Sequence, residues 1–214
     1  MYQRIDGNNW RHIWIMGDLH GCHQRLMRAL RDCRFNPYQD LLISVGDIID
    51  RGPESLPCLR LLNRRWFKAV RGNHEQMAID SLEAGDMSLW TLNGGVWFTQ
   101  LPADAQQEAR ALLRACDALP WIIELHCESG KHIIAHADYP AREYKWQKAV
   151  EREAVLWRRE RLNALLAGKG EAITGADHFW FGHTPLEQRI DTENLHYIDT
   201  GAVFSGNLTL ARVQ

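Results

Sequence analysis

Short hydrophobic runs recur along the chain, and each one stops at a glycine or at a cluster of polar residues. Most are about five residues long, the usual length of a β-strand, and their hydrophobic positions are continuous instead of alternating, which is typical of buried strands. The runs occupy residues 12–16, 41–45, 66–70, 132–135 and 179–181. We therefore predict five buried strands, each followed at its carboxyl end by a polar cluster.

Two amphipathic stretches lie between the first three runs. Residues 22–33 place Leu26, Met27 and Leu30 on one side of a helix, and residues 54–65 place leucines at every third position. The chain thus opens with a β-α-β-α-β pattern, which predicts an α/β fold with a parallel sheet and helical crossovers. Because ligands bind beyond the carboxyl ends of such strands, the polar clusters can converge in one site.

The remaining segments complete this prediction. Residues 76–130 are predicted to be a mostly helical insertion beside the site, and residues 147–167 a second helical stretch. The tail, residues 195–213, predicts two strands joined by a Ser-Gly-Asn turn. No repeat, linker or low-complexity segment interrupts the chain, so we expect residues 1–214 to form a single domain.

Composition narrows the class of protein. Hydrophobic residues make up 45% and charged residues 24% of the 214 residues, which excludes global disorder. The net charge of −2 argues against a nucleic-acid partner, and no apolar run reaches the roughly 20 residues of a membrane span. Five cysteines without a CxxC pair and a start without an apolar signal core predict reduced thiols in a cytoplasmic protein.

The polar clusters supply carboxylate, imidazole, amide and guanidinium groups but no thiolate. Their members are Asp18, His20, Asp47, Asp50, Arg51, Arg71, Asn73, His74, His136 and His183. Oxygen and imidazole ligands suit Mn, Fe, Zn or Ni, and there are more of them than one tetrahedral ion needs. We predict two divalent ions bridged by Asp47, with Asp18 and His20 completing one ion. Asn73, His136 and His183 would complete the other.

Such a pair of ions predicts phosphoester hydrolysis. Two ions about 3.5–4 Å apart can lower the pKa of a bridging water and orient a phosphoryl group for in-line attack. Arg51 and Arg71 adjoin the ligands, and their planar guanidinium groups suit contacts with phosphate. His74, directly after Asn73, is the predicted general acid for the leaving alkoxide, and Asp50 would accept a hydrogen bond from its ring.

The motifs GDLHG, GDIIDRG, RGNHE, HAD and GHT, in this order, resemble the signature of the metal-dependent phosphoprotein phosphatase family. The segments HADYP and WFGHTP resemble its compact bacterial and phage branch, that of phage lambda phosphatase and the Prp-type serine/threonine phosphatases. The resemblance implies an α/β (α+β) four-layer sandwich of two β-sheets flanked by helices, with a dinuclear site that usually holds Mn.

The resemblance also implies roles for individual residues. It places the metal ligands on Asp18, His20, Asp47, Asn73, His136 and His183, and the proton donor on His74 with Asp50 as its partner. The phosphate would contact Asn73, Arg51, Arg71 and one further arginine after the HAD motif. We select Arg159 for this last role, with Arg158 and Arg161 as rivals, because the spacing does not decide among them.

The implied activity is hydrolysis of phosphoserine and phosphothreonine in phosphorylated proteins. A shallow site that recognises the phosphate more than the side chain would also accept phosphotyrosine or phosphohistidine. No regulatory subunit is expected, since the docking surfaces and long C-terminal extension of eukaryotic members are not found in the sequence.

Three alternatives remain open. A symmetrical dinucleoside tetraphosphate hydrolase is the main rival, but Asp50, Arg71 and Glu75 match the protein phosphatases. A nuclease of the same fold is disfavoured by the net charge. A non-catalytic phospho-binding module would usually lack a ligand or the general acid, and all of them are present.

Overall fold

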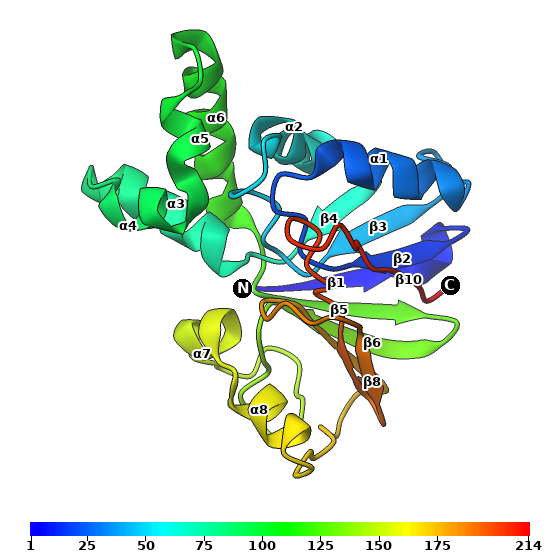
Figure 1. The fold of residues 1–214 in the computed structure, drawn as a ribbon. Helices are drawn as coiled ribbons and strands as arrows, with labels where there is room; N and C mark the ends of the chain where they lie inside the picture. The colour runs from blue at the N-terminus through cyan, green and yellow to red at the C-terminus, as the bar shows by residue number, and fades with distance from the viewer.

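Two β-sheets lie face to face in the computed structural model, which describes all residues from Met1 to Gln214 (Figure 1). The four-stranded sheet has the order β10-β2-β3-β4 and contains β2 (Ile13–Met16), β3 (Leu41–Ser44), β4 (Phe67–Ala69) and β10 (Leu210–Arg212). The six-stranded sheet has the order β1-β5-β6-β7-β9-β8 and contains β1 (Tyr2–Asp6), β5 (Ile122–Cys127), β6 (Gly130–Ala135), β7 (His178–Phe181), β8 (Ile190–Thr192) and β9 (Leu195–Tyr197).

The strands carry hydrophobic residues on both faces because each sheet is covered on both sides. Successive side chains of a strand point to opposite faces, so Ile13 and Ile15 of β2 meet Ile123 and Leu125 of β5 between the sheets. Met16 of β2 points the other way, into a cluster of 23 buried residues beneath the helices. This arrangement explains why the predicted strands have continuous hydrophobic runs.

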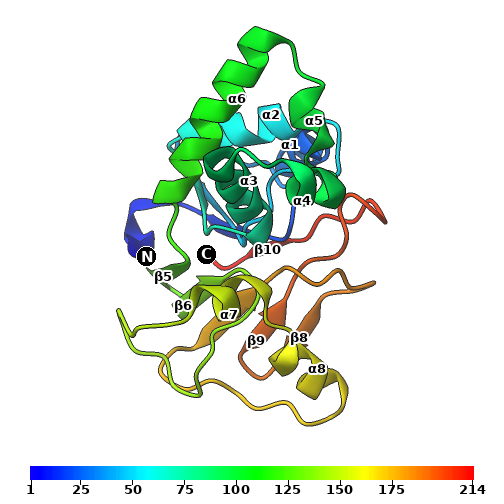
Figure 2. The same ribbon diagram turned by 90° about the vertical axis from the view of Figure 1, so that its left-hand side faces the viewer.

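Helices form the two outer layers of the sandwich. The four-stranded sheet is covered by α1 (His23–Asp32), α2 (Ser55–Leu59), α3 (Asn73–Ala84) and α6 (Ala103–Ala115). The six-stranded sheet is covered by α7 (Arg152–Trp157) and α8 (Glu160–Leu166). Figures 1 and 2 show these layers above and below the two sheets, which confirms the predicted four-layer sandwich.

The parallel order of β2, β3 and β4 confirms the predicted β-α-β-α-β opening. The predicted helix over residues 54–65 is divided into α2 and a 3₁₀ turn, Arg60–Asn63, and the predicted helical stretch 147–167 is divided into α7 and α8. Three strands, β1, β5 and β8, were not predicted.

The insertion at residues 76–130 is mostly helical. The helical prediction is wrong for its last part, which forms β5. Between α3 and α6 the insertion contains α4 (Ser88–Trp90), a turn that is kinked at Gly94 (Thr91–Gly95) and α5 (Val96–Thr99), and a 3₁₀ turn, Cys116–Ala118, follows α6. β5 forms a hairpin with β6 and pairs in parallel with β1. These long-range pairings are what make Ile122–Cys127 a strand.

The predicted tail hairpin is also wrong. Both strands exist, but β9 lies between β7 and β8, whereas β10 pairs antiparallel with β2 in the other sheet. The Ser-Gly-Asn segment therefore belongs to a loop that crosses between the sheets. The physical reason is burial, since β10 places Ala211 in the layer between the sheets.

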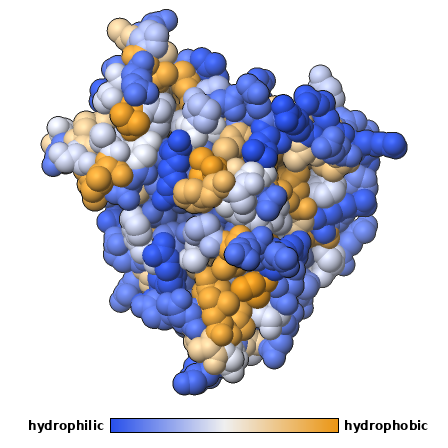
Figure 3. All heavy atoms as spheres, in the orientation of Figure 1, coloured by the Kyte–Doolittle hydropathy of each residue, from blue (hydrophilic) through white to orange (hydrophobic).

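No helix of the structure has both the length and the apolar character that crossing a membrane requires. Hydrophobic side chains on the face shown in Figure 3 lie in separate patches within a hydrophilic surface. Exposed apolar residues of the insertion include Leu89, Leu92 and Val96, while its Trp90 and Trp97 are buried. The insertion thus turns the indole rings of Trp90 and Trp97 toward the body of the protein.

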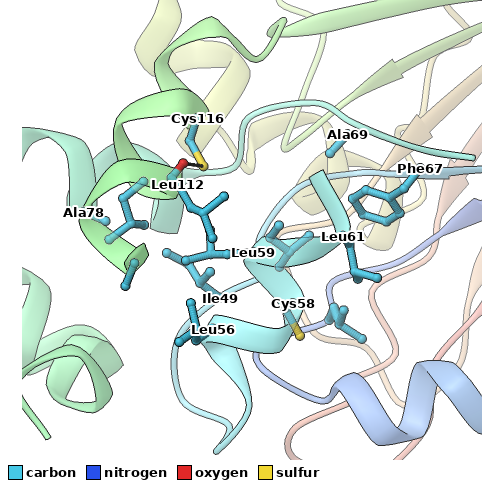
Figure 4. Packing of buried hydrophobic residues seen from close by; sticks show 14 of the residues in the cluster. Ile49, Leu56, Cys58, Leu59, Leu61, Phe67, Ala69, Ala78, Leu112 and Cys116 are labelled. Atoms are coloured by element: carbon cyan, nitrogen blue, oxygen red, sulfur yellow. Dashed lines mark hydrogen bonds between the residues drawn. The ribbon is translucent and has the colours of Figure 1, made fainter. Parts of the chain in front are cut away.

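Leu59 of α2 tests the packing of the outer helical layer. It is fully buried, and Figure 4 shows it beside Leu112 of α6 and Ile49. Leu59→Ala leaves a cavity and should lower the free energy of unfolding by about 2–5 kcal/mol, measured by urea denaturation. Leu166→Ala, at a site that is 61% exposed, should change it by less than about 0.5 kcal/mol. Equal losses in the two variants would contradict this packing.

Candidate active site

The loops that follow β2, β3, β4 and β7 meet where the two sheets adjoin. The backbone N–H of His183, after β7, donates to the Asp18 carboxylate at 3.1 and 3.2 Å, which joins the two sheets. The backbone N–H of His20 donates to the Asp47 carbonyl at 2.9 Å, and that of His74 donates to Asp47 Oδ1 at 3.0 Å. Clusters far apart in the sequence therefore lie together at one site, which is called the pocket below.

The backbone in these loops is strained. Eight non-glycine residues of the chain have positive φ, and five of them are predicted site residues: His20, Asp47, Asp50, Arg51 and His183. Side chains with a Cβ disfavour this region, so such conformations persist only where the surroundings impose them, and they concentrate at functional sites. The strain thus marks the same pocket that the sequence motifs indicate.

Glu75 holds the loop that carries Asp47. Its carboxylate accepts hydrogen bonds from the backbone N–H groups of Gly72, Asp47 and Ile48, each at 2.9 Å. A Cβ at Gly72 would clash with Asp47 Oδ1, so this position requires glycine. Burial raises the pKa of Glu75 to about 7, assisted by the charge of Asp47 and opposed by the bond from Gly72. The sequence analysis did not identify this positioning role.

His20, Asp47 and His74 form one group of closely spaced ligand atoms. Asp47 Oδ2 lies 3.7 Å from His20 Nε2 and 3.9 Å from His74 Nε2. The Nδ1–H of His20 donates to the Ile49 carbonyl at 2.9 Å, which leaves the Nε2 lone pair directed into the pocket. Burial lowers the pKa of His20 to about 3, so this imidazole is neutral at pH 7, as a metal ligand must be.

Asp47, His136 and His183 form a second such group. His136 Nε2 lies 3.4 Å from Asp47 Oδ2 and 2.8 Å from Asn73 Oδ1, and His183 Nδ1 lies 2.9 Å from the same amide oxygen. The Nδ1–H of His136 donates to the Val45 carbonyl at 2.8 Å. Neutral His136 therefore presents a lone pair to another acceptor, an arrangement that a cation between them would stabilise.

Buried negative charge is concentrated around Asp47. Burial raises the pKa of Asp18 well above its ordinary value, and the charges of Asp199 and Asp47 add to the effect. Burial also raises the pKa of Asp199 to about 6. Burial alone would raise the pKa of Asp47, but His136 and His74 outweigh burial and lower that pKa well below its ordinary value. Buried carboxylates need paired cations or bound metal. The residues present therefore fit bound divalent metal, and the two groups of ligand atoms, neither of which includes Asp18, share Asp47.

His74 and Asp50 form a buried pair beside these groups. The Nδ1–H of His74 donates to Asp50 Oδ2 at 2.7 Å, which leaves His74 Nε2 facing Asp47. Asp50 also accepts hydrogen bonds from the indole N–H groups of Trp90 and Trp97. The sequence analysis did not single out either tryptophan, although they flank the Asn-Gly-Gly of the insertion and could have been noticed there.

The two arginines after β3 and β4 are placed differently. Arg51 is exposed, and its Nη1 contacts His20 Nε2. The His20 nitrogen could therefore bind an ion only after the guanidinium group moved away. Arg71 is buried and directed toward the insertion, where it donates to Gln76 Oε1 at 2.8 Å and lies 3.0 Å from Asp117 Oδ1. These contacts are the ones that hold its guanidinium group, and its phosphate contact stays a prediction.

Three arginines after the HAD motif are candidates for a phosphate contact, and Arg159 is the one that bonds to a residue beside His183. Its Nε donates to Thr184 Oγ1 at 3.1 Å, one residue beyond His183. Arg161 instead donates to Asp138 Oδ1 at 2.7 Å and to two backbone carbonyls. Arg158 forms ion pairs only with two glutamates on its own segment. Of the three, Arg159 is the one that contacts a residue adjacent to His183.

Similarity to known proteins extends over most of the chain. The family model described as calcineurin-like phosphoesterase matches residues 11–199. The chain is 59% identical over its full length to serine/threonine-protein phosphatase 1 of Salmonella typhimurium, of which it covers 97%. It is 46% identical over 213 residues to serine/threonine-protein phosphatase 2 of Escherichia coli, covering 98% of that protein.

Sequence similarity to nucleotide-cleaving proteins extends over less of the chain. A symmetrical bis(5'-nucleosyl)-tetraphosphatase of Mannheimia succiniciproducens is 47% identical over 64 residues, which are 29% of this chain. A crystal structure provisionally described as a diadenosine tetraphosphatase superposes with a TM-score of 0.71 at 24% identity, covering 99% of this chain and 93% of that one. At this identity the superposition supports the fold alone.

Metal binding to this site should weaken as the pH falls. Burial by itself would lower the pKa of His136, but the Asp47 carboxylate outweighs burial and raises that pKa above its ordinary value. Below the raised pKa, His136 must lose a proton before it can bind an ion, so the Kd for Mn should rise by about tenfold per pH unit for one displaced proton. Isothermal titration calorimetry of the metal-free chain with Mn, repeated between about pH 5.5 and 8, measures this change in Kd.

The matched control is His126→Gln, which changes a half-exposed histidine outside the pocket and should leave the pH dependence intact. His136→Gln should weaken binding and remove the dependence on this proton. An affinity for Mn that stays constant between about pH 5.5 and 8 in the unaltered chain would contradict ligation by His136.

Proposed function

Because the chain belongs to the calcineurin-like phosphoesterase family, we propose that it is a metal-dependent protein phosphatase that hydrolyses phosphoserine and phosphothreonine. The observation that carries the proposal is the buried His74–Asp50 pair, placed so that His74 faces the Asp47 shared by the two ligand groups. Identity of 59% over the whole chain with a serine/threonine-protein phosphatase supports it further.

The proposed ligands of one ion are Asp18, His20 and Asp47. Those of the other are Asp47, Asn73, His136 and His183, and all six residues are buried. When bound, two divalent cations, for which we propose Mn before Fe, Zn or Ni, would lower the pKa of the attacking water and neutralise charge on the phosphoryl group. The chain itself supplies the proton and the remaining positive charge.

His74 is the proposed general acid. Its Nδ1–H is held by Asp50 at 2.7 Å, so its Nε2 is the nitrogen that can give a proton to the leaving serine or threonine oxygen. A seryl alkoxide is a poor leaving group, and proton donation should matter most for such substrates. Asp50 orients the ring and stabilises its protonated form, as a carboxylate does in other acid–base pairs.

Arg51 and Arg159 are the proposed phosphate contacts at the mouth of the pocket, and Asn73 and Arg71 are further candidates. Both Arg51 and Arg159 have exposed guanidinium groups beside predicted metal ligands, Arg51 at His20 and Arg159 next to His183. Planar guanidinium groups bind phosphate oxygens in a bidentate way without contacting the rest of the substrate. We therefore propose that phosphotyrosine and phosphohistidine are also accepted and that phosphorylated proteins are the partners.

A symmetrical dinucleoside tetraphosphatase is the second candidate, because of the partial match to such a protein. That match spans 29% of the chain, whereas the match to the serine/threonine-protein phosphatase spans all of it. Asp50, Arg71 and Glu75 match the protein phosphatases, and in the structure Asp50 bonds to the proposed acid and Glu75 to the loop of Asp47.

The Mn-loaded chain should hydrolyse a phosphoserine peptide in preference to diadenosine tetraphosphate. His74→Asn should lower kcat for the peptide by about 10²–10⁴-fold, because the leaving alkoxide then lacks its proton donor. The loss for p-nitrophenyl phosphate should be smaller, since its leaving group is a better one. Phosphate release is the measurement, and elemental analysis must show unchanged metal content.

The matched control is His126→Asn, which should retain full activity with both substrates. A chelator should abolish hydrolysis, and added Mn should restore it. Preference for the dinucleotide over the phosphopeptide would contradict the proposed function, and full peptide activity in His74→Asn would contradict the role of His74.

A further inference from the structure

We propose that Trp90 and Trp97 are positioning residues, whose indole N–H groups lock the Asp50 carboxylate that orients His74. The helical insertion would then control proton donation to the leaving group. This inference rests on the proposed function, since it concerns how the proposed general acid is held. Both indoles are buried and donate to the Asp50 carboxylate, so both residues would act through Asp50.

Three side-chain N–H groups converge on one carboxylate. Trp90 Nε1 lies 3.0 Å from Asp50 Oδ1 and 2.9 Å from Oδ2, and Trp97 Nε1 lies 2.7 Å from Oδ1. His74 Nδ1 donates to Oδ2 at 2.7 Å. Asp50 and Trp90 are fully buried and Trp97 is 8% exposed, so water does not replace these donors. Hydrogen bonds to a buried carboxylate are among the stronger ones in proteins.

The insertion is shaped to deliver both indoles to the same point. Trp90 ends α4 and Trp97 lies in α5, on either side of the kinked turn, and their rings meet edge to face with centroids 5.9 Å apart. A Cβ on Gly95 would lie 2.5 Å from Trp90 Nε1, so a larger residue there would displace this donor. The segment between the two indoles kinks at Gly94, whose φ of 109° is not helical. Packing alone would not require two N–H groups on one acceptor.

The same segment also supports the strained loop that carries Asp50. Asp50 and Arg51 have φ of 73° and 66°, two successive residues in the left-handed region. The backbone N–H of Arg51 donates to the Gly94 carbonyl at 3.2 Å, and that of Asp50 donates to Ser55 Oγ at 2.9 Å. Such conformations need external support. The insertion therefore holds both the partner of the proposed acid and a proposed phosphate arginine.

Removing the indole donors should affect proton donation more than any other step. Without them, the Asp50 side chain keeps His74 as its one side-chain donor, and the carboxylate can rotate away from the ring. His74 would then lose its fixed orientation, while Asp47 and the other ligands keep their own contacts. The expected signature is a rate loss that depends on whether the leaving group needs a proton.

Trp90→Phe and Trp97→Phe test this directly, because each keeps an aromatic ring and removes one N–H. Each should lower kcat for a phosphoserine peptide by about tenfold, and the double variant by about 100-fold, within the range of general acid catalysis. KM should stay within about twofold, as should kcat for 2,4-dinitrophenyl phosphate, whose leaving group needs no proton. Elemental analysis of each Mn-loaded variant excludes loss of metal as the cause.

Trp180→Phe is the matched control. Trp180 is a buried tryptophan between the sheets, and its indole N–H donates to His132 Nδ1 at 3.0 Å, so this variant also loses a buried donor. It should leave the rates with both substrates unchanged. A general effect of losing any buried indole donor would instead appear in all three variants.

A second measurement does not depend on activity. The chain has nine tryptophans, and an amide and indole N–H correlation spectrum of the metal-free protein should resolve their indole signals. Asp50→Asn should shift two of these signals upfield, and the two Phe variants identify them as Trp90 and Trp97. This readout remains decisive if either Phe variant fails to fold.

Equal losses with both substrates in the Phe variants, or indole signals unmoved by Asp50→Asn, would overturn the inference and leave the proposed phosphatase activity standing. Absence of phosphopeptide hydrolysis by the unaltered Mn-loaded chain would overturn the proposed function, and the kinetic role of the indoles with it. A loss confined to the phosphoserine peptide, together with two shifted indole signals, is the result that the structure predicts.

Discussion

Burial of several carboxylates at one point is the constraint on which the rest of this structure depends. Asp18, Asp47 and Asp199 are each almost completely buried, and burial, assisted by the charge of Asp47, raises the pKa of Asp18 and of Asp199. Such an arrangement is costly unless cations balance it. The neutral imidazoles of His20 and His136 direct lone pairs into this group, so that bound ions could balance the charge. The fold holds these groups together at the junction of its two sheets.

Several local features serve this constraint. The left-handed backbone at Asp47, the glycine at Gly72 and the three bonds to Glu75 fix one carboxylate where neighbouring loops can reach it. A second set of bonds, from Trp90 and Trp97 to Asp50, fixes the partner of His74. Glu75 thus supports the carboxylate proposed to bind metal, and the two tryptophans of the insertion support the pair proposed to donate the proton.

Sequence patterns predicted the buried strands and the convergence of their polar loops, because continuous hydrophobic runs and strand-end clusters are local signals. They did not predict β5 or the separation of β9 from β10, since both depend on pairings between distant segments. They also missed the roles of Glu75, Trp90 and Trp97, whose partners lie far along the chain. For Arg159, contact with Thr184 favoured one of three candidates that spacing left open.

Anomalous diffraction from crystals grown with Mn tests the central claim most directly. The account predicts two Mn positions about 3.5–4 Å apart, both bonded to Asp47, one adjoining Asp18 and His20 and the other adjoining Asn73, His136 and His183. A single Mn position in this pocket, or two positions of which only one contacts Asp47, would contradict it.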